Sequence, residues 1–303
     1  MNAFKSGFVS ILGRPNAGKS TLLNALVGQK VAIVADKPQT TRTAIQGVVT
    51  MPEAQIVFID TPGIHKSDTP LNKRMMAAVR GSLEERDCFL FLVDATVPFS
   101  EVDAQALSVF HKDGPPVIMV LNKIDAIGNR HHMLPFLDQY EKLFPFAEFV
   151  PISALTGQGF DKLKEQILKR LPEGPEYFPA DHVTDQPARF LAAELIREKV
   201  LRLTRQEVPH STTVVIDQWE EGDRLIRIYA TVFVEREGQK GIIIGKQGAM
   251  LKTIGTQSRE EMEALFGVKV YLDLHVKVEG SWREKAAFLN TIDWRTMSGR
   301  DEN

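Results

Sequence analysis

The stretch Gly13-Arg14-Pro15-Asn16-Ala17-Gly18-Lys19-Ser20 decides the fold, because it matches the phosphate-binding pattern G-x-x-x-x-G-K-S at every fixed position. The apolar residues 8–12 before it predict a buried strand, and residues 21–26 after it predict the first turns of a helix. A loop between a strand and a helix start directs unpaired backbone N–H groups and the positive end of the helix dipole at phosphate. The pattern therefore indicates a nucleoside triphosphate as the ligand, and a chance match of a glycine-rich turn is the weaker alternative.

The fixed residues of this loop each have a chemical task. Gly13 and Gly18 let the backbone wrap closely around the phosphates. Lys19 is expected to reach the β- and γ-phosphates, and the Ser20 hydroxyl is expected to bind Mg²⁺. The other nucleotide-binding residues predicted in this region are Asn16, Ala17 and Thr21.

Three more apolar segments end in polar motifs. These motifs are Asp60-Thr61-Pro62-Gly63, Asn122-Lys123-Ile124-Asp125 and Ser153-Ala154-Leu155. Ligands of open α/β sheets bind at the carboxyl ends of the strands, so all four loops are expected to face one nucleotide. Asp60 is predicted to hold Mg²⁺ through a water molecule. The Gly63 N–H is predicted to bond the γ-phosphate, so that this loop senses whether that phosphate is present.

Hydrogen-bond polarity predicts the base. An ionised Asp125 only accepts hydrogen bonds, so it fits the N1–H and 2-amino donors of guanine and not adenine. Asn122 is expected to orient the loop, and Lys123 is expected to lay its stem across the ring. Ala154 N–H is expected to meet guanine O6, beside Ser153. The alternative for Asn122 and Asp125 is a helix N-cap, which the accompanying motifs disfavour.

Composition fits a two-domain protein without a membrane span. The chain has 303 residues, of which 43% are hydrophobic and 25% are charged. A formal net charge of −2 excludes a globally basic RNA-coating surface, so any nucleic-acid contact must come from a local patch. Cys88 is the one cysteine and lies in an apolar run, which predicts a buried strand residue. No apolar run approaches about 18 residues and no secretion signal is recognisable, so we expect a cytoplasmic location.

The pattern predicts an α/β P-loop domain over residues 1–171 and a smaller α+β domain over residues 188–303. In the first domain, apolar strands alternate with helices expected at 71–86, 102–112, 133–143 and 160–171, as in a mostly parallel sheet covered on both faces. Prolines and glycine break the pattern after residue 171, so residues 172–187 are predicted to be a linker.

The second domain resembles a type II KH domain. A helix at 188–203, strands at 212–219 and 225–235, the apolar residues 241–244, a helix at 249–266 and a strand at 269–278 follow in that order. In such domains a G-x-x-G loop clamps the nucleic-acid backbone while an adjacent apolar surface receives single-stranded bases. The predicted RNA-binding residues are Lys240, Gly245, Lys246, Gln247, Gly248 and Lys252. For Trp282, Arg283, Trp294 and Arg295 in the tail, packing is favoured over RNA contact.

The GTPase motifs, together with Gln39-Thr40-Thr41-Arg42, resemble the translation-factor-like branch of GTPases and within it the Era family, which joins a GTPase domain to an RNA-binding domain. The resemblance implies that Thr41, directly before the arginine, is the second Mg²⁺ ligand and acts in catalysis with Lys19 and Gly63. Thr40 and Thr43 stay open as alternatives, because the sequence does not fix the register of this loop.

Ile64 follows the D-x-x-G motif where Ras-like GTPases carry a glutamine that orients the attacking water. Its side chain neither donates nor accepts, so intrinsic hydrolysis is expected to be slow. Relatives with a hydrophobic residue here and an asparagine at the position of Asn16 resemble K⁺-assisted GTPases. Asn16 is therefore a candidate K⁺ ligand, and the alternative is that it only stabilises the turn.

These inferences combine into a GTP-hydrolysing switch whose nucleotide state alters how a KH domain engages RNA. The Era resemblance implies that the RNA is the 3′ end of small-subunit ribosomal RNA, that the small ribosomal subunit is the partner, and that the role is its maturation or assembly. We expect no DNA partner and a monomer. The alternatives are an RNA-binding scaffold with a structural nucleotide pocket, and a signalling switch attached peripherally to the inner membrane face. No basic amphipathic helix or lipidation motif favours the latter.

Overall fold

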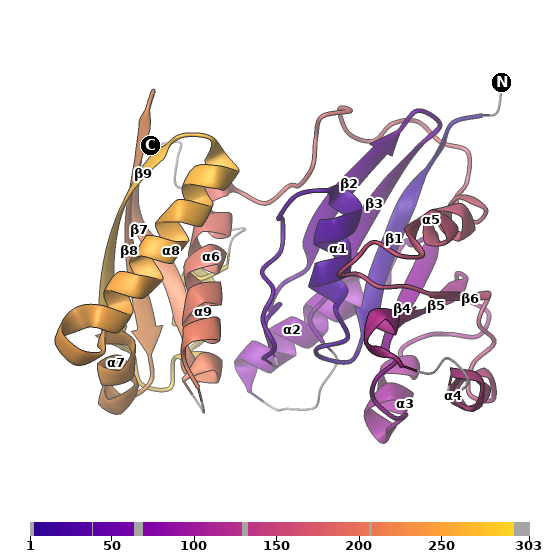
Figure 1. The fold of residues 1–303 in the computed structure, drawn as a ribbon, viewed down its shortest axis with the longest axis horizontal. Helices are drawn as coiled ribbons and strands as arrows, with labels where there is room; N and C mark the ends of the chain where they lie inside the picture. The colour runs from indigo at the N-terminus through magenta and orange to yellow at the C-terminus, as the bar shows by residue number, and fades with distance from the viewer. Residues whose placement is uncertain (1–2, 38, 64–68, 129–132, 206–207, 294–303) are drawn as a thin grey trace. The chain divides into compact units, whose positions relative to one another are not determined.

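The computed structural model of the chain is drawn in Figure 1, and the residues it describes are 3–37, 39–63, 69–128, 133–205 and 208–293. The backbone divides into two compact units. The first unit contains residues 1–32, 41–67 and 74–185. The second unit contains residues 33–40, 68–73 and 186–303.

The first unit is built on a sheet of six strands in the order β2-β3-β1-β4-β5-β6. The strands are β1 Lys5–Gly13, β2 Ile45–Met51, β3 Ala54–Asp60, β4 Cys88–Asp94, β5 Val117–Asn122 and β6 Glu148–Pro151. All neighbouring strands run parallel except β2 and β3, which form an antiparallel pair. The prediction of a mostly parallel sheet is confirmed. The strand β2, which pairs with β3 across a short turn, was not predicted from the sequence.

Helices cover both faces of this sheet. They are α1 Lys19–Val27, α2 Pro70–Gly81, α3 Glu101–Leu107, α4 Met133–Glu141 and α5 Phe160–Leu168. An apolar cluster joins α2, α3 and α4 to one face, and α1 and α5 lie over the other (Figure 1). Every residue of β4 is buried, as expected for a central parallel strand, and Cys88 is fully buried within it.

The helix ends differ from the sequence-based expectation. α1 begins at Lys19, directly after Gly18 in the left-handed conformation with φ 96°. α2 ends at Gly81 rather than at 86, because Ser82 turns its hydroxyl back onto the Val79 carbonyl at 2.6 Å. α3 and α5 also end earlier than predicted, at Leu107 and Leu168.

Much of the segment predicted to be a linker is bound to the first unit. Its backbone accepts hydrogen bonds from Ser6 N–H at Pro172 O, 3.2 Å, and from Val48 N–H at Val183 O, 2.8 Å. The Gln55 amide adds a bond to Phe178 O at 2.8 Å. The division between units therefore falls after Asp185 rather than after residue 171.

The second unit has the order of a type II KH domain, as predicted. Its elements are α6 Ala188–Leu203, β7 Thr213–Gly222, β8 Leu225–Val234, α7 Glu237–Ile244, α8 Ala249–Phe266, β9 Lys269–Val278 and α9 Ala286–Thr291. The strand order is β7-β8-β9, with β7 antiparallel and β9 parallel to β8. One apolar core joins α6, α7 and α8 to the sheet.

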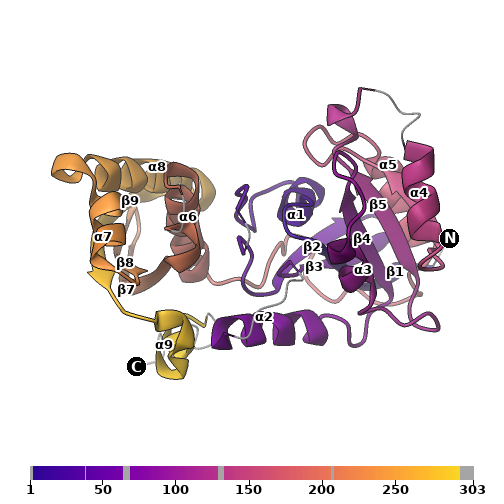
Figure 2. The same cartoon turned by 90° about the horizontal axis from the view of Figure 1, so that it is seen from below.

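The C-terminal part of the second unit is packed as the sequence analysis favoured. Trp282 is fully buried, and its indole N–H donates to Ser211 O at 2.8 Å. Figure 2 shows α9 apart from the three packed helices, and its Phe288 ring lies 5.0 Å from that of Phe233. Trp294 and Arg295 lie outside the described residues. Within the described part of the chain, no helix has the length and apolar character needed to cross a bilayer.

Candidate functional site

The strand-end motifs of the first unit meet through one buried amide. Asn122, the last residue of β5, donates from Nδ2 to the Ala17 carbonyl at 2.8 Å. Its Oδ1 accepts the Ala154 N–H at 2.8 Å. Gly18 must lack a side chain, because a Cβ there would lie 2.3 Å from Asn122 Nδ2. The phosphate loop thus contacts the two motifs predicted to bind the base, as expected for loops at the ends of parallel strands.

The conformation of the phosphate loop explains its residue types. Gly13 has φ 150°, and a Cβ there would meet Leu92 O at 2.2 Å. Asn16 is exposed and left-handed at φ 63°, a conformation that asparagine tolerates better than most residues. Lys19 Nζ donates to Gly13 O at 3.3 Å and Arg14 O at 3.1 Å. Its ammonium group is therefore held inside the loop.

Arg14 of the same loop is held by an acid that the sequence analysis missed. Its Nη1 donates to Asp103 Oδ2 at 3.1 Å, and the Asp103 side chain is fully buried at the start of α3. The same oxygen accepts the Ser100 N–H at 3.0 Å as part of a capping box. The Ser100–Asp103 spacing was the available signal, but it predicts a cap rather than a partner for Arg14. This ion pair attaches the phosphate loop to the start of α3.

A cluster of oxygen atoms lies where Mg²⁺ was predicted. Ser20 Oγ donates to Asp60 Oδ2 at 2.6 Å and lies 2.9 Å from Thr41 Oγ1. Thr41 Oγ1 lies 3.3 Å from Asp60 Oδ2. The Thr40 hydroxyl is occupied elsewhere, because it donates to Lys37 O at 2.6 Å. Thr41, rather than Thr40, is thus placed with Ser20 and Asp60.

The electrostatics of this cluster fit a hard cation. Asp60 Oδ1 is buried and has no hydrogen-bond partner among the described residues. Burial raises the pKa of the Asp60 carboxyl, while the Lys19 charge and the bonds from Ser20 and Thr41 oppose that shift. Burial lowers the pKa of the Lys19 ammonium, and Asp60 opposes it. A buried carboxylate with a free oxygen, beside two hydroxyls, has the donor set that Mg²⁺ prefers.

Gly63 lies against the phosphate loop. A Cβ at this position would lie 2.9 Å from Pro15 Cγ and 3.0 Å from Pro15 Cα, so a side chain does not fit without displacing the loop. The backbone N–H of Gly63 is therefore carried close to the phosphate loop, as its predicted contact with the γ-phosphate requires. Ile64 lies outside the described residues.

The residues predicted to bind the base lie in the turns after β5 and β6. Lys123 is left-handed at φ 67°, and its Nζ forms an ion pair with Asp94 Oδ2 at 2.7 Å. Asp94 ends β4 and was missed, although its position at a strand tip was a signal. Asp125 lies exposed in the 3₁₀ turn Ile124–Ala126. Ser153 is fully buried, and its hydroxyl accepts the Thr156 N–H at 3.2 Å.

The second unit presents the predicted RNA-binding loop beside a groove. Gly245 has φ 70°, and a Cβ there would lie 2.7 Å from Met250 Cβ, while Gly248 has φ 78° and open space around it. A groove of about 390 Å³ begins at Gly248. Its other lining residues are Leu251, Lys252, Gly255, Thr256, Arg259, Leu272 and Leu274. Lys246, Gln247 and Lys252 are exposed, and Lys240 is half-buried.

A P-loop sheet whose strand tips gather these four motifs, followed by a KH fold with a G-x-x-G loop, defines a GTPase joined to an RNA-binding module. Comparisons with family models agree, since a 50S ribosome-binding GTPase model matches residues 8–123 and a KH domain model matches residues 207–283. GTPase Era of Geobacter metallireducens is 50% identical over 295 residues, which cover 97% of this chain and 99% of the relative. GTPase Era of Syntrophus aciditrophicus is 48% identical over 293 residues, which cover 96% and 95%. The chain therefore belongs to the Era family of GTPases.

Two solved structures have the same fold over 96% of the chain. One is an Era variant from Aquifex aeolicus bound to GDP·AlF₄⁻, and the other is Era in complex with MgGDPNP and nucleotides 1506–1542 of 16S ribosomal RNA. Each is 45% identical to this chain with a TM-score of 0.92, and the match covers 96% of this chain and 99% of the other. The predicted family, fold class and GTPase activity are confirmed.

Proposed function

We propose that this GTPase binds GTP and Mg²⁺ at the strand tips of its first unit and uses the nucleotide state to control ribosomal RNA binding by its second. The observation that carries the nucleotide part is the contact of Ser20, Thr41 and Asp60 around one buried, partly unpaired carboxylate. Bound there, Mg²⁺ would neutralise charge on the β- and γ-phosphates. Ser20 and Thr41 would ligate it directly, and Asp60 would hold it through water.

The proposal extends to the rest of the nucleotide site. Lys19 exchanges its bonds to the Gly13 and Arg14 carbonyls for the β- and γ-phosphates, which have stronger acceptor oxygens. The N–H groups of residues 16–21 and Gly63 surround the phosphates. Asp125 accepts from the guanine ring. Ala154 N–H, now bonded to Asn122 Oδ1, is the donor proposed for guanine O6.

Asn16 is the proposed K⁺ ligand of this site. Its exposed side chain is available, but its left-handed φ of 63° alone also accounts for an asparagine in this turn. Hydrolysis rates measured in KCl and NaCl at equal ionic strength decide between the two roles. A higher rate in KCl that Asn16→Ala removes supports ion binding, whereas equal rates reduce Asn16 to a turn residue.

The RNA part rests on the groove beside the G-x-x-G loop. Its floor is apolar at Leu251, Leu272 and Leu274, and Lys252 lines it together with Arg259. Arg259 is already paired with Glu263 at 3.1 Å, so Lys252 and the loop Lys246 offer the more available cations. An apolar floor with a cationic edge suits stacked single-stranded bases and their phosphates. The proposed ligand is the 3′ end of small-subunit ribosomal RNA, since a related Era structure contains nucleotides of 16S ribosomal RNA.

The biological role that follows is assistance in maturation or assembly of the small ribosomal subunit. The test is the affinity of the full chain for a labelled oligonucleotide with the 3′-terminal sequence of its own small-subunit RNA, at one salt concentration. The expected result is a different dissociation constant with a non-hydrolysable GTP analogue than with GDP, because a ligand shifts an equilibrium only through differential affinity. Equal RNA affinities in the two nucleotide states would show that the nucleotide does not control RNA binding.

A further inference from the structure

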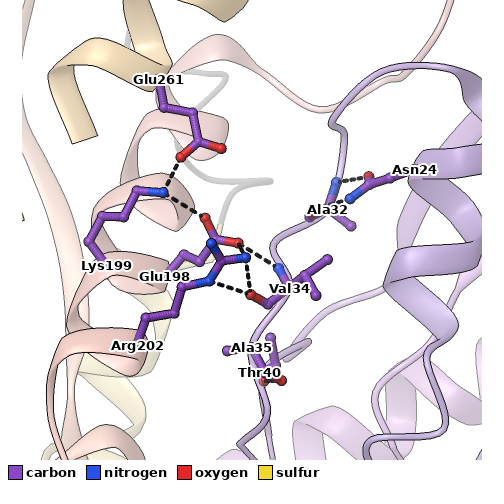
Figure 3. A network of polar contacts seen from close by, with 9 residues as sticks. All are labelled: Asn24, Ala32, Val34, Ala35, Thr40, Glu198, Lys199, Arg202 and Glu261. Carbon is purple, nitrogen blue, oxygen red and sulfur yellow. Dashed lines mark hydrogen bonds and ion pairs between the residues drawn. The ribbon is translucent and has the colours of Figure 1, made fainter. Parts of the chain in front are cut away.

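The segment that precedes Thr41 is bound through its backbone by helix α6 of the second unit. The Val34 N–H donates to Glu198 Oε1 at 2.9 Å, and Arg202 donates to the Val34 carbonyl from Nε at 3.0 Å and from Nη2 at 2.9 Å. Arg202 and Glu198 also pair with each other at 3.0 Å. Figure 3 shows the resulting closed ring, in which two charged side chains one helical turn apart satisfy both polar groups of one residue.

The same segment is held again at its other end. Arg197 donates from Nη2 to the Thr40 carbonyl, and its guanidinium is fixed by Glu194 at 2.7 and 2.6 Å. Arg197 is only 1% exposed. The Thr40 hydroxyl closes the segment on itself by donating to Ala35 O at 3.2 Å as well as to Lys37 O. Helix α6 therefore binds the backbone of this segment at Val34 and again at Thr40.

The hydrogen-bond partners of the backbone change from α1 to α6 between Ala32 and Val34. Asn24 of α1, in the first unit, accepts the N–H groups of Val31 and Ala32 at 2.9 Å each and donates to Ala32 O at 2.7 Å. Two residues later, the Val34 N–H is bonded instead to Glu198 of α6 (Figure 3). At the far end, Thr41 directly follows Thr40 and returns to Ser20 and Asp60 of the first unit. The held loop thus ends one peptide bond from the proposed Mg²⁺ ligand.

The charges on α6 are costly unless they serve these contacts. Glu198 is fully buried, and its second oxygen accepts Lys199 Nζ at 3.1 Å, while Lys199 also pairs with Glu261. A buried charge is tolerated only when its hydrogen-bonding groups are satisfied. Val34 N–H supplies one of the bonds to Glu198, so the carboxylate and the loop depend on each other. Apolar side chains on α6 would bury more surface but would not bind a backbone.

We infer that Glu198, Arg202 and Arg197 are positioning residues for GTP hydrolysis, which hold Val34 and Thr40 so that Thr41 stays beside Ser20 and Asp60. The inference rests on the proposed role of Thr41 as a Mg²⁺ ligand. Thr41 lies in the oxygen cluster while α6 holds the loop, so the held loop is compatible with the triphosphate state. By linkage, GTP strengthens the attachment of the loop to α6 as much as that attachment strengthens GTP.

The test compares full-length variants by their affinities for fluorescent GDP and a fluorescent non-hydrolysable GTP analogue in excess Mg²⁺. Arg202→Met removes both donors to Val34 O while Lys199 still neutralises Glu198, and Arg202 is half exposed, so the fold should persist. The expected result is at least a fivefold loss of preference for the analogue over GDP, the low end of a typical coupling. GDP affinity stays unchanged, because switch-loop contacts depend on the γ-phosphate. Arg197→Met is expected to lower the preference for the analogue as well. In both variants, kcat for GTP hydrolysis is expected to fall by a larger factor than KM for GTP rises.

Two controls separate the possible failures. Arg283→Met breaks an ion pair with Glu235 in the same unit and should leave the preference unchanged. Thr41→Ala should lower the preference at least as much as Arg202→Met. If Thr41→Ala lowers it and Arg202→Met does not, the inference about α6 is wrong and the nucleotide site stands. If Thr41→Ala has no effect, the proposed role of Thr41 and the inference fall together.

Discussion

Asp125 and Asn122 stand at one strand end but have different tasks. Asn122 is buried, and its side-chain amide is hydrogen-bonded to the backbone of Ala17 and Ala154. Asp125 is exposed in the following turn, so its carboxylate is accessible to a base. Asp125→Asn is therefore expected to keep the fold and change the base. A site that pairs polar groups rejects a mismatched base by up to about 10⁴-fold. We expect GTP affinity to fall by roughly two to four orders of magnitude and xanthosine triphosphate to become the preferred ligand.

Calorimetric titration of the Asp125→Asn variant with GTP, ATP and xanthosine triphosphate measures this change. Lys19→Ala is the matched control, since it removes the phosphate contact and should weaken all three nucleotides equally. Unchanged GTP affinity in the Asp125→Asn protein would contradict the assignment of the base-reading residue.

The reactivity of Cys88 reports on the opening of the central sheet, and no catalytic role is assigned to this thiol. It is fully buried at the start of β4, and burial raises the pKa of its thiol to about 12. Only the thiolate reacts with disulfide reagents, so at pH 8 the folded protein should react far more slowly than a free thiol. Addition of 5,5′-dithiobis(2-nitrobenzoic acid) before and after denaturation tests this, with one thiol released only on unfolding. Rapid reaction of the native protein would show that β4 opens.

Among the elements, the G-x-x-G turn allows the effect of backbone conformation on RNA binding to be tested separately from the effect of charge. Gly248 has φ 78° but open space for a Cβ, and asparagine and aspartate both tolerate a left-handed residue. Gly248→Asn and Gly248→Asp have the same shape and differ by one negative charge. Two unit charges about 4 Å apart in water interact by about 1 kcal/mol, so the aspartate variant should bind RNA about fivefold more weakly than the asparagine variant.

Binding of the ribosomal RNA oligonucleotide to both Gly248 variants measures that difference. Hydrolysis without RNA should be the same in both, because the substitutions lie in the second unit. Equal RNA affinities would place the phosphate backbone away from this turn.

The elements also show which features were predictable from sequence. Fixed spacing and local periodicity predicted the phosphate loop, and they predicted α6, α8 and β9 with the observed bounds. The strand β2 was missed because it directly follows a polar, irregular loop. The partners of Arg14 and Lys123, Asp103 and Asp94, were missed because they come from distant elements. The hold of α6 on Val34 leaves no sequence signal at all, since it is directed at the backbone of that residue.

At the scale of the whole molecule, the net charge of −2 limits how RNA is bound. Between Lys240 and Lys285 the chain carries eight basic and six acidic residues, so no broad positive field draws in nucleic acid. Arg259 in the groove is paired with Glu263, which leaves Lys240, Lys246 and Lys252 as the cations predicted to contact phosphate. Three phosphate contacts correspond to a slope of about −2 in log K against log salt for single strands.

That slope distinguishes a local clamp from a basic coat. Titrations of the full chain with the RNA oligonucleotide between 50 and 300 mM KCl should give a slope of about −2, and Lys252→Ala should reduce its magnitude by about 0.7. Lys162→Ala, an exposed change in α5, is the matched control and should leave it unchanged. A slope steeper than about −5 would mean that many more phosphates are neutralised than the groove and its turn supply. Affinity must then come from surfaces other than the one assigned to RNA.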